Sequence, residues 1–187
     1  RYPGRIVTET CWNTTSSLFH EPYSYSKTLA EKEAWRLAER QDRWSLVTIN
    51  PSMILGPSLN SAPTSDSFST IRMLIDGTTR LGAPRVGISV VDVREVAQAH
   101  IAAAFLSEAH GRYITSAEDT DVFALTSTLL PRFGGSLPLP RRAAPRPVVI
   151  ALAPALGQTR AYIRRNVGHA VRVDASRSRL ELGTRYR

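Results

Sequence analysis

The chain alternates long helical patterns with short apolar runs rich in β-branched residues, and this alternation restricts it to an α/β fold. A helical pattern covers residues 22 to about 43, and the strand-like run 44–50 follows it directly. A second apolar run, 86–91, precedes another helical pattern over 93–107. Strands that alternate with helices in this way are typical of parallel sheets covered by helices. We therefore expect a parallel sheet with flanking helices.

Shorter elements are expected around this framework. The patterns predict further strands at 5–8, 111–115 and 171–174. They predict further helices at 68–76, 120–130, 148–156, 159–166 and 175–182. Residues 51–57 are predicted as a turn-rich exit from the first long strand, where parallel sheets place their ligand sites, and 58–69 as a long loop.

Tyr23 and Lys27 lie four residues apart at the start of the first helical pattern, so both side chains occupy one helix face. Tyr25 lies on roughly the opposite side and has no cationic neighbour in this geometry. The stripe with Tyr23 and Lys27 continues through small and apolar residues, Ala30, Ala34, Leu37 and Ala38. We therefore expect this face to pack against the rest of the protein.

A tyrosine beside a lysine is suited to proton transfer. A free tyrosine has a reference pKa of about 10, and lowering it to about 7 requires roughly 4 kcal/mol in favour of the phenolate. An ammonium group supplies part of this stabilisation, and the helix N-terminus marked by Pro22 supplies more. Lys27 and Lys32 are the only lysines among 24 basic residues. The alternative interpretation is a pair of partly exposed residues on an amphipathic helix.

Composition restricts the setting of the protein. The single cysteine, Cys11, excludes an intrachain disulfide and suits a reducing cytoplasm, where we expect the protein to work. The four histidines are scattered, so no metal site is predicted. The longest apolar run, 148–156, contains Pro154 and is about half the length of a membrane span, and the N-terminus lacks the apolar segment of a signal peptide.

The formal net charge of +8 raises the question of nucleic acid. Residues 132–187 contain twelve arginines against only Asp174 and Glu181. Aromatic residues are few there, and the sequence contains no recognisable zinc-finger, basic-zipper or RNA-binding motif. We expect no nucleic-acid partner, and a non-catalytic basic binding module is retained as an alternative function.

Together these features resemble the extended short-chain dehydrogenase/reductases. Within them the sequence is most similar to the dihydroflavonol reductase-like and 3β-hydroxysteroid dehydrogenase-like branch, which is close to the NAD-dependent epimerases and dehydratases. The similar segments follow the family's order and are residues 9–12, 22–32, 50–52, 91–97, 173–179 and 181–183.

The resemblance implies an NAD- or NADP-dependent carbonyl reductase or alcohol dehydrogenase acting on a small molecule. Tyr23 would be the general acid that protonates the carbonyl oxygen as hydride arrives from the nicotinamide, and Lys27 would hold the nicotinamide ribose and favour the phenolate. Pro51 and Ser52 would border the nicotinamide through backbone contacts, and Ser67, in the following loop, would be a further cofactor contact. A sugar-nucleotide epimerase or dehydratase would use the same Tyr23 and Lys27 and is the alternative enzyme.

The resemblance also implies a division of the chain. Residues 1–60 and 86–108 would be the remainder of a Rossmann-like dinucleotide-binding domain. Residues 61–85 and 109–187 would form a smaller, mostly helical substrate-binding subdomain. Asp92 fits a structural helix cap better than a catalytic role.

Two family features are missing from the sequence. None of the eleven glycines forms the family's glycine-rich phosphate-binding turn, and no serine stands in the context of the family's catalytic serine. The chain therefore resembles the C-terminal portion of a reductase, and we expect it to be inactive alone.

Overall fold

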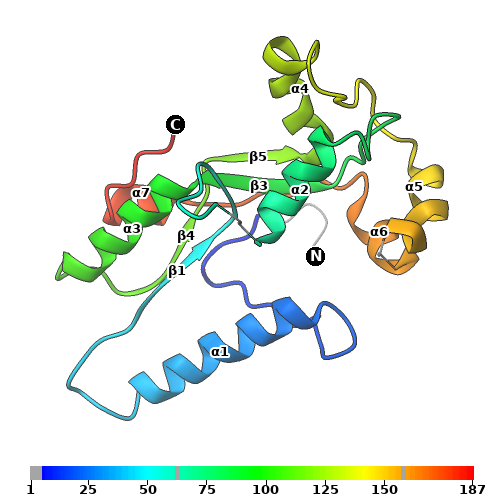
Figure 1. The fold of residues 1–187 in the computed structure, drawn as a ribbon. Coiled ribbons are helices and arrows are strands. Elements are labelled where there is room, and N and C mark those ends of the chain that lie inside the picture. Colours follow the sequence, from blue (N-terminus) through cyan, green and yellow to red (C-terminus); the bar gives the residue numbers. More distant parts are fainter. Residues whose placement is uncertain (1–5, 62–63, 157–158) are drawn as a thin grey trace.

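The computed structural model describes residues 6–61, 64–156 and 159–187, and it has the expected α/β architecture (Figure 1). Its helices are α1 (Pro22–Ala38), α2 (Asp66–Ile75), α3 (Val93–Phe105), α4 (Val122–Phe133), α5 (Arg146–Leu152), α6 (Arg160–Asn166) and α7 (Ser176–Glu181), with a short 3₁₀ helix, η1 (Ala153–Leu156). Its strands are β1 (Val47–Pro51), β2 (Met53–Leu55), β3 (Gly87–Asp92), β4 (Gly111–Thr115) and β5 (Glu118–Asp121).

β1 and β4 form a parallel pair with helices on both faces. Ile49 lies opposite Tyr113, and Thr48 lies opposite Arg112. Because successive residues of a strand face opposite sides, Ile49 and Tyr113 point towards α3 and α7, whereas Thr48 and Arg112 point towards α1. The predicted parallel pairing with flanking helices is confirmed.

A second sheet has the order β2, β3, β5. β2 runs parallel to β3 within the segment predicted only as a turn-rich exit, and its apolar residues explain why it joins the sheet. β5 runs antiparallel to β3 and occupies the start of the helix predicted at 120–130, so that helix begins later, at Val122. Asp121 caps it by accepting a hydrogen bond from the Ala124 amide at 2.8 Å.

The buried side chains of the described residues form three clusters, two of which share the half-buried Val86. One joins α3, β4 and α7 through Ala99, Tyr113 and Leu182. A second surrounds Leu74, Ala83 and Val122. A third lies between α5 and α6 and contains Val149, Ala153, Ile163 and Val167.

Tyr113 anchors the C-terminal helix. It is fully buried, and its hydroxyl donates to the Glu181 carboxylate at 2.6 Å. Arg177 pairs with the same carboxylate at 3.0 Å and lies 4.5 Å from the centre of the Tyr113 ring. Burial raises the pKa of Tyr113, so its hydroxyl stays a donor at neutral pH.

The described residues of the strands predicted at 5–8 and 171–174 form a single β-bridge and not a longer strand. Val7 pairs in parallel with Val173, and the Val7 amide donates to the Arg172 carbonyl at 2.8 Å. Arg5, which the prediction included, lies outside the described residues.

The helix predicted to run to about residue 43 ends at Ala38. Gln41 is the reason, because its side chain replaces helical hydrogen bonds. Its amide group donates to the Trp44 carbonyl at 2.7 Å, and its oxygen accepts from the amides of Arg43 and Trp44. The strand predicted at 44–50 accordingly begins later, at Val47, and includes Pro51.

The division into residues 1–60 with 86–108 and residues 61–85 with 109–187 stays a prediction. Strands of the two predicted units pair with each other, because β1 and β3 of the first unit pair with β4 and β5 of the second. Among the described helices, none combines the length and apolar character needed to cross a membrane.

Candidate active site

α1 contacts the sheet through a polar face centred on Glu31. The Glu31 carboxylate accepts hydrogen bonds from Arg112 Nε at 2.7 Å and Nη2 at 3.2 Å. Thr48 Oγ1 donates to it at 3.0 Å and Asn50 Nδ2 at 3.1 Å, so β1 and β4 both hold the helix. Trp35, one turn along α1, adds a donor at 3.4 Å.

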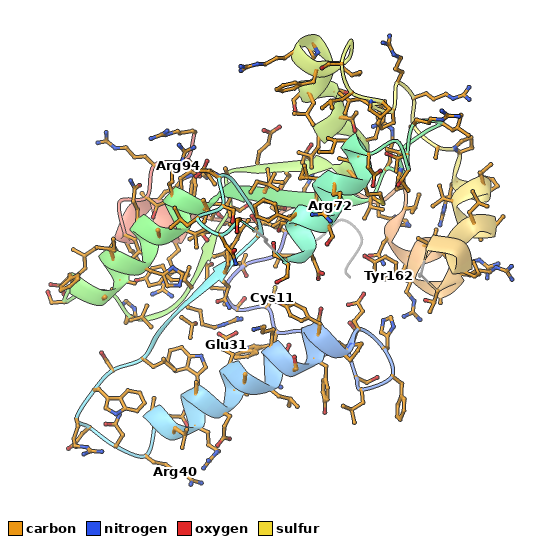
Figure 2. All side chains as sticks on the ribbon, viewed as in Figure 1. Cys11, Glu31, Arg40, Arg72, Arg94 and Tyr162 are labelled. Atoms are coloured by element: carbon orange, nitrogen blue, oxygen red, sulfur yellow. The ribbon has the colours of Figure 1, made fainter. Side chains whose placement is uncertain are left out.

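Arg112 links the same contact to the N-terminal segment. Its Nη1 group donates to the backbone carbonyls of Glu9 and of Cys11, the latter at 3.0 Å. Its guanidinium lies 4.1 Å from the centre of the Trp12 ring, a cation–π contact. Figure 2 shows Glu31 and Cys11 in the region between α1 and the strands. Two segments that carry the family resemblance therefore meet at Arg112, a residue that no sequence motif marks.

The surroundings of Glu31 favour its charged form. Burial alone would raise the pKa of the Glu31 carboxyl, but hydrogen bonds and charge from Arg112, with hydrogen bonds from Thr48 and Trp35, outweigh burial. The net effect holds the pKa below its ordinary value of 4.5. At neutral pH the Glu31–Arg112 ion pair is fully formed.

A pH dependence follows from this lowered pKa. Because the folded-state pKa lies below the unfolded value, the stability contributed by ionised Glu31 is fully present above pH 4.5 and is lost as the pH falls through the folded-state value. We expect the difference in unfolding free energy between the wild-type chain and Glu31→Gln to be largest above about pH 5 and to shrink below it. Urea unfolding between pH 7 and pH 3 measures this difference. A difference that grows towards acid pH would contradict the assignment.

Tyr23 and Lys27 share one face of α1 as predicted. The Lys27 ammonium lies over the Tyr23 ring, 5.5 Å from its centre. Pro22 occupies the first turn, and the N-cap residue provides no side-chain hydrogen bond. The amide groups at the start of α1 are thus available to stabilise negative charge near Tyr23.

The prediction that this face packs against the protein is wrong for most of the stripe. Tyr23 is 67% exposed and Leu37 is 48% exposed, and Ala30 is exposed as well, whereas Ala34 and Ala38 on the same stripe are half-buried. Glu31 lies about 80° around the helix from Tyr23, at 100° per residue. The hydrogen bonds of Glu31 turn its own face to the sheet and leave most of the neighbouring apolar stripe exposed.

The other predicted cofactor contacts lie at the end of β1 and in α2. Pro51 is the last residue of β1 and is exposed, and the Ser52 amide donates to the Thr115 carbonyl at 2.9 Å. The Ser52 hydroxyl oxygen is buried and has no hydrogen-bond partner among the described residues. Ser67 lies in the first turn of α2, not in the preceding loop as expected.

Hydrogen bonds connect α1 to the end of β1. Glu31, one turn beyond Lys27, accepts from Asn50, which directly precedes Pro51. The structure thereby joins the Tyr23–Lys27 helix and the Pro51–Ser52 turn through Glu31. Ser67 has no such connection among the described contacts.

Asp92 has the structural role predicted for it. Its carboxylate accepts from the Arg94 amide at 2.8 Å, while Glu95 accepts from the Asp92 amide at 3.2 Å, which completes a capping box at the start of α3. Hydrogen bonds from Arg94 lower the pKa of Asp92 to about 2.

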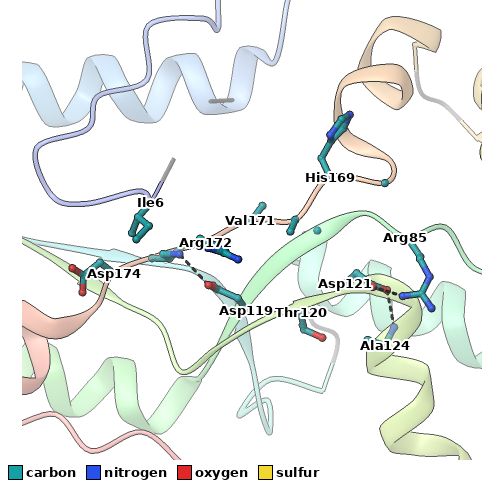
Figure 3. A pocket seen from close by; sticks show the side chains of 14 residues that line it. Ile6, Arg85, Asp119, Thr120, Asp121, Ala124, His169, Val171, Arg172 and Asp174 are labelled. Atoms are coloured by element: carbon teal, nitrogen blue, oxygen red, sulfur yellow. Dashed lines mark hydrogen bonds and ion pairs between the residues drawn. The ribbon is translucent and has the colours of Figure 1, made fainter. Parts of the chain in front are cut away.

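An open pocket of about 760 Å³ lies away from these residues, between β5 and residues 168–174 (Figure 3). Three of its charged side chains, Arg85, Asp119 and Asp121, are engaged with their neighbours. Arg85 pairs with Asp121 at 3.0 Å, and Asp119 accepts from Ser89 at 2.6 Å and from the Val173 amide at 3.1 Å. Its lining includes none of the five predicted site residues.

Comparison with known proteins gives the family. No family model matches the sequence. Over 141 residues the chain is 35% identical to anthocyanidin reductase from Arabidopsis thaliana, an alignment that covers 70% of this chain and 41% of that protein. Over 150 residues it is 34% identical to cinnamoyl-CoA reductase CAD2 from Medicago truncatula, covering 77% of this chain and 43% of that protein.

Solved structures agree on the fold. Gre2 from Candida albicans in complex with NADPH matches 97% of this chain and 53% of its own, at 26% identity and a TM-score of 0.69. The chain belongs to the extended short-chain dehydrogenase/reductases. This confirms the resemblance found in the sequence. The chain spans less than half the length of the two curated relatives, as a C-terminal portion of the family's chain would.

Proposed function

We propose that this chain carries the proton-transfer helix and the substrate-binding part of an NAD(P)-dependent carbonyl reductase. The observation that carries the proposal is the Tyr23–Lys27 pair at the start of α1, in a helix that Glu31 ties to the end of β1. Membership of a family of NAD(P)-dependent reductases supports it. The substrate would be a small molecule with a carbonyl group, and residues 1–60 with 86–108 would belong to the cofactor-binding unit.

Each residue has a distinct role in this proposal. Tyr23 donates its phenolic proton to the carbonyl oxygen as hydride from the reduced nicotinamide reaches the carbonyl carbon. Lys27 stabilises the phenolate that is left and holds the nicotinamide ribose. The exposed stripe of α1 leaves both groups accessible to a cofactor and a substrate.

The residues present fit one end of the dinucleotide. The buried, unpartnered Ser52 hydroxyl and the exposed Pro51 lie at the carboxyl end of a parallel strand, the usual ligand edge of such sheets. When bound, the nicotinamide would supply the hydride. The glycine-rich turn that holds the pyrophosphate in this family does not occur in the sequence. In this proposal the chain therefore supplies residues for the nicotinamide end of the dinucleotide. The pyrophosphate would be bound by residues outside this sequence.

We predict that the 187-residue chain alone neither binds NADH or NADPH tightly nor oxidises them. A chimera is expected to do both if the chain replaces the matching part of Arabidopsis anthocyanidin reductase, because the reductase supplies the missing phosphate-binding half. Calorimetric titration measures binding. NADPH oxidation with flavonoid ketones and simple aldehydes measures turnover.

Either of two results would overturn the proposal. Micromolar binding and turnover by the chain alone would show that it is complete. A chimera that melts cooperatively and binds NADPH, yet oxidises it with none of the carbonyl compounds, would exclude the reductase function.

A further inference from the structure

Among the described residues, one ion pair joins α1 to the sheet, and a cation–π contact of Lys32, 5.6 Å from the centre of the Trp12 ring, joins the helix to the N-terminal segment. The helix has no buried residue, so apolar packing contributes little to its position. Of its ion pairs within the described residues, Arg36–Glu33 lies inside the helix, and only Glu31–Arg112 joins α1 to another element. The side chains of Glu31 and Arg112 are 14% and 17% exposed, which shields this contact from water.

The contact is directional. An ionised carboxylate offers about four acceptor positions, and five donor groups from β1, β4 and α1 surround that of Glu31. Two of the five belong to one guanidinium, whose planar fork fixes orientation as well as distance. An apolar helix face can slide or rotate by small amounts at little cost, whereas this arrangement fixes both the rotation of α1 and its position along β1.

The same contact lies between the two halves of the candidate active site. Along α1, Glu31 is one turn from Lys27 and two turns from Tyr23. Along β1, its partner Asn50 is next to Pro51. A displacement of α1 therefore changes the position of the Tyr23 hydroxyl relative to the end of β1.

We propose that Glu31, held by Arg112, is a positioning residue that keeps Tyr23 and Lys27 in register with the Pro51–Ser52 end of β1. Glu31 touches neither cofactor nor substrate and acts through Tyr23. The inference rests on the proposed function, since it assigns Tyr23 the proton transfer.

The first test uses the full 187-residue chain and needs no activity. Hydrogen exchange followed by mass spectrometry compares wild type with Glu31→Gln and with Glu33→Gln, a control on the same helix whose exposed carboxylate pairs with Arg36 alone among the described residues. We expect α1 amides to exchange about tenfold faster or more in Glu31→Gln, as the loss of a charge-assisted hydrogen bond would give. Peptides of β3 and α4 should be unchanged, and Glu33→Gln should resemble wild type. Uniformly faster exchange, or unchanged α1 exchange, would overturn the inference.

The second test measures kinetics in the chimera. Glu31→Gln is expected to lower kcat about tenfold to hundredfold, the scale of an ångström-sized misplacement, with the KM for NADPH within about twofold. In a Tyr23→Phe background the same substitution should have little further effect, because the group it positions is gone. An equal loss in both backgrounds would overturn the positioning role. A Tyr23→Phe variant with full activity would instead remove Tyr23 from the proposed mechanism, and a chimera that binds NADPH without oxidising it would exclude the proposed function, so these failures are distinguishable from that of the positioning role.

Discussion

Tyr23→Phe is expected to lower the kcat of the chimera by about two to four orders of magnitude, the usual contribution of a general acid. The substitution removes the phenolic proton and keeps the ring, so the Lys27 ammonium retains its contact with the ring face. The KM for NADPH should therefore change little. Steady-state NADPH oxidation at saturating substrate measures both quantities.

Tyr25→Phe is the matched control. Tyr25 lies on the same helix, but two residues from Lys27 and therefore on a different face. The chimera with Tyr25→Phe should retain nearly full activity. A larger loss at Tyr25 than at Tyr23 would identify Tyr25 as the proton donor, and unchanged turnover in Tyr23→Phe would remove Tyr23 from the mechanism.

Arg112→Ala is expected to produce the largest loss of stability among single substitutions near the site. Removing one partner of a fully buried ion pair costs about 3–5 kcal/mol, and because this pair keeps some contact with water we expect about 2–3 kcal/mol. The substitution also leaves the carbonyls of Glu9 and Cys11 without their donor and exposes the Trp12 ring. For a domain of this size, the thermal midpoint should fall by roughly 5–10 °C.

Arg36→Ala provides the comparison for this measurement. Arg36 forms an ion pair with Glu33 on the surface of α1, where both side chains are largely exposed. Such pairs contribute little, so its thermal midpoint should match wild type. Calorimetric melting of both variants decides the point. An Arg112→Ala midpoint within about 1 °C of wild type would show that Arg112 does not hold the helix.

Local sequence patterns were sufficient for most secondary structure. β-Branched and apolar runs located β1, β3 and β4, and helical periodicity located α1 and α3. Asp92 was expected to be a structural helix cap, and it caps the start of α3 together with Glu95. The shared face of Tyr23 and Lys27 also follows from spacing alone.

Local patterns failed where a distant partner decided the outcome. β2 and β5 form because β3 lies beside them, and the described residues around Val7 and Val173 are joined by one bridge only. Helix α1 ends early because Gln41 competes for its final hydrogen bonds.

The amino-acid sequence by itself determined the family, the α/β class and the pairing of Tyr23 with Lys27, since these depend on residue type and short spacing. Only the tertiary structure decided which face of α1 meets the sheet. The apolar stripe predicted that the face with Tyr23 packs against the protein. Instead, the hydrogen bonds from Arg112, 81 residues beyond Glu31, bring the polar face with Glu31 to the sheet. An ion pair with directed hydrogen bonds, shielded between helix and strands, outweighs the burial of a few alanines and one leucine.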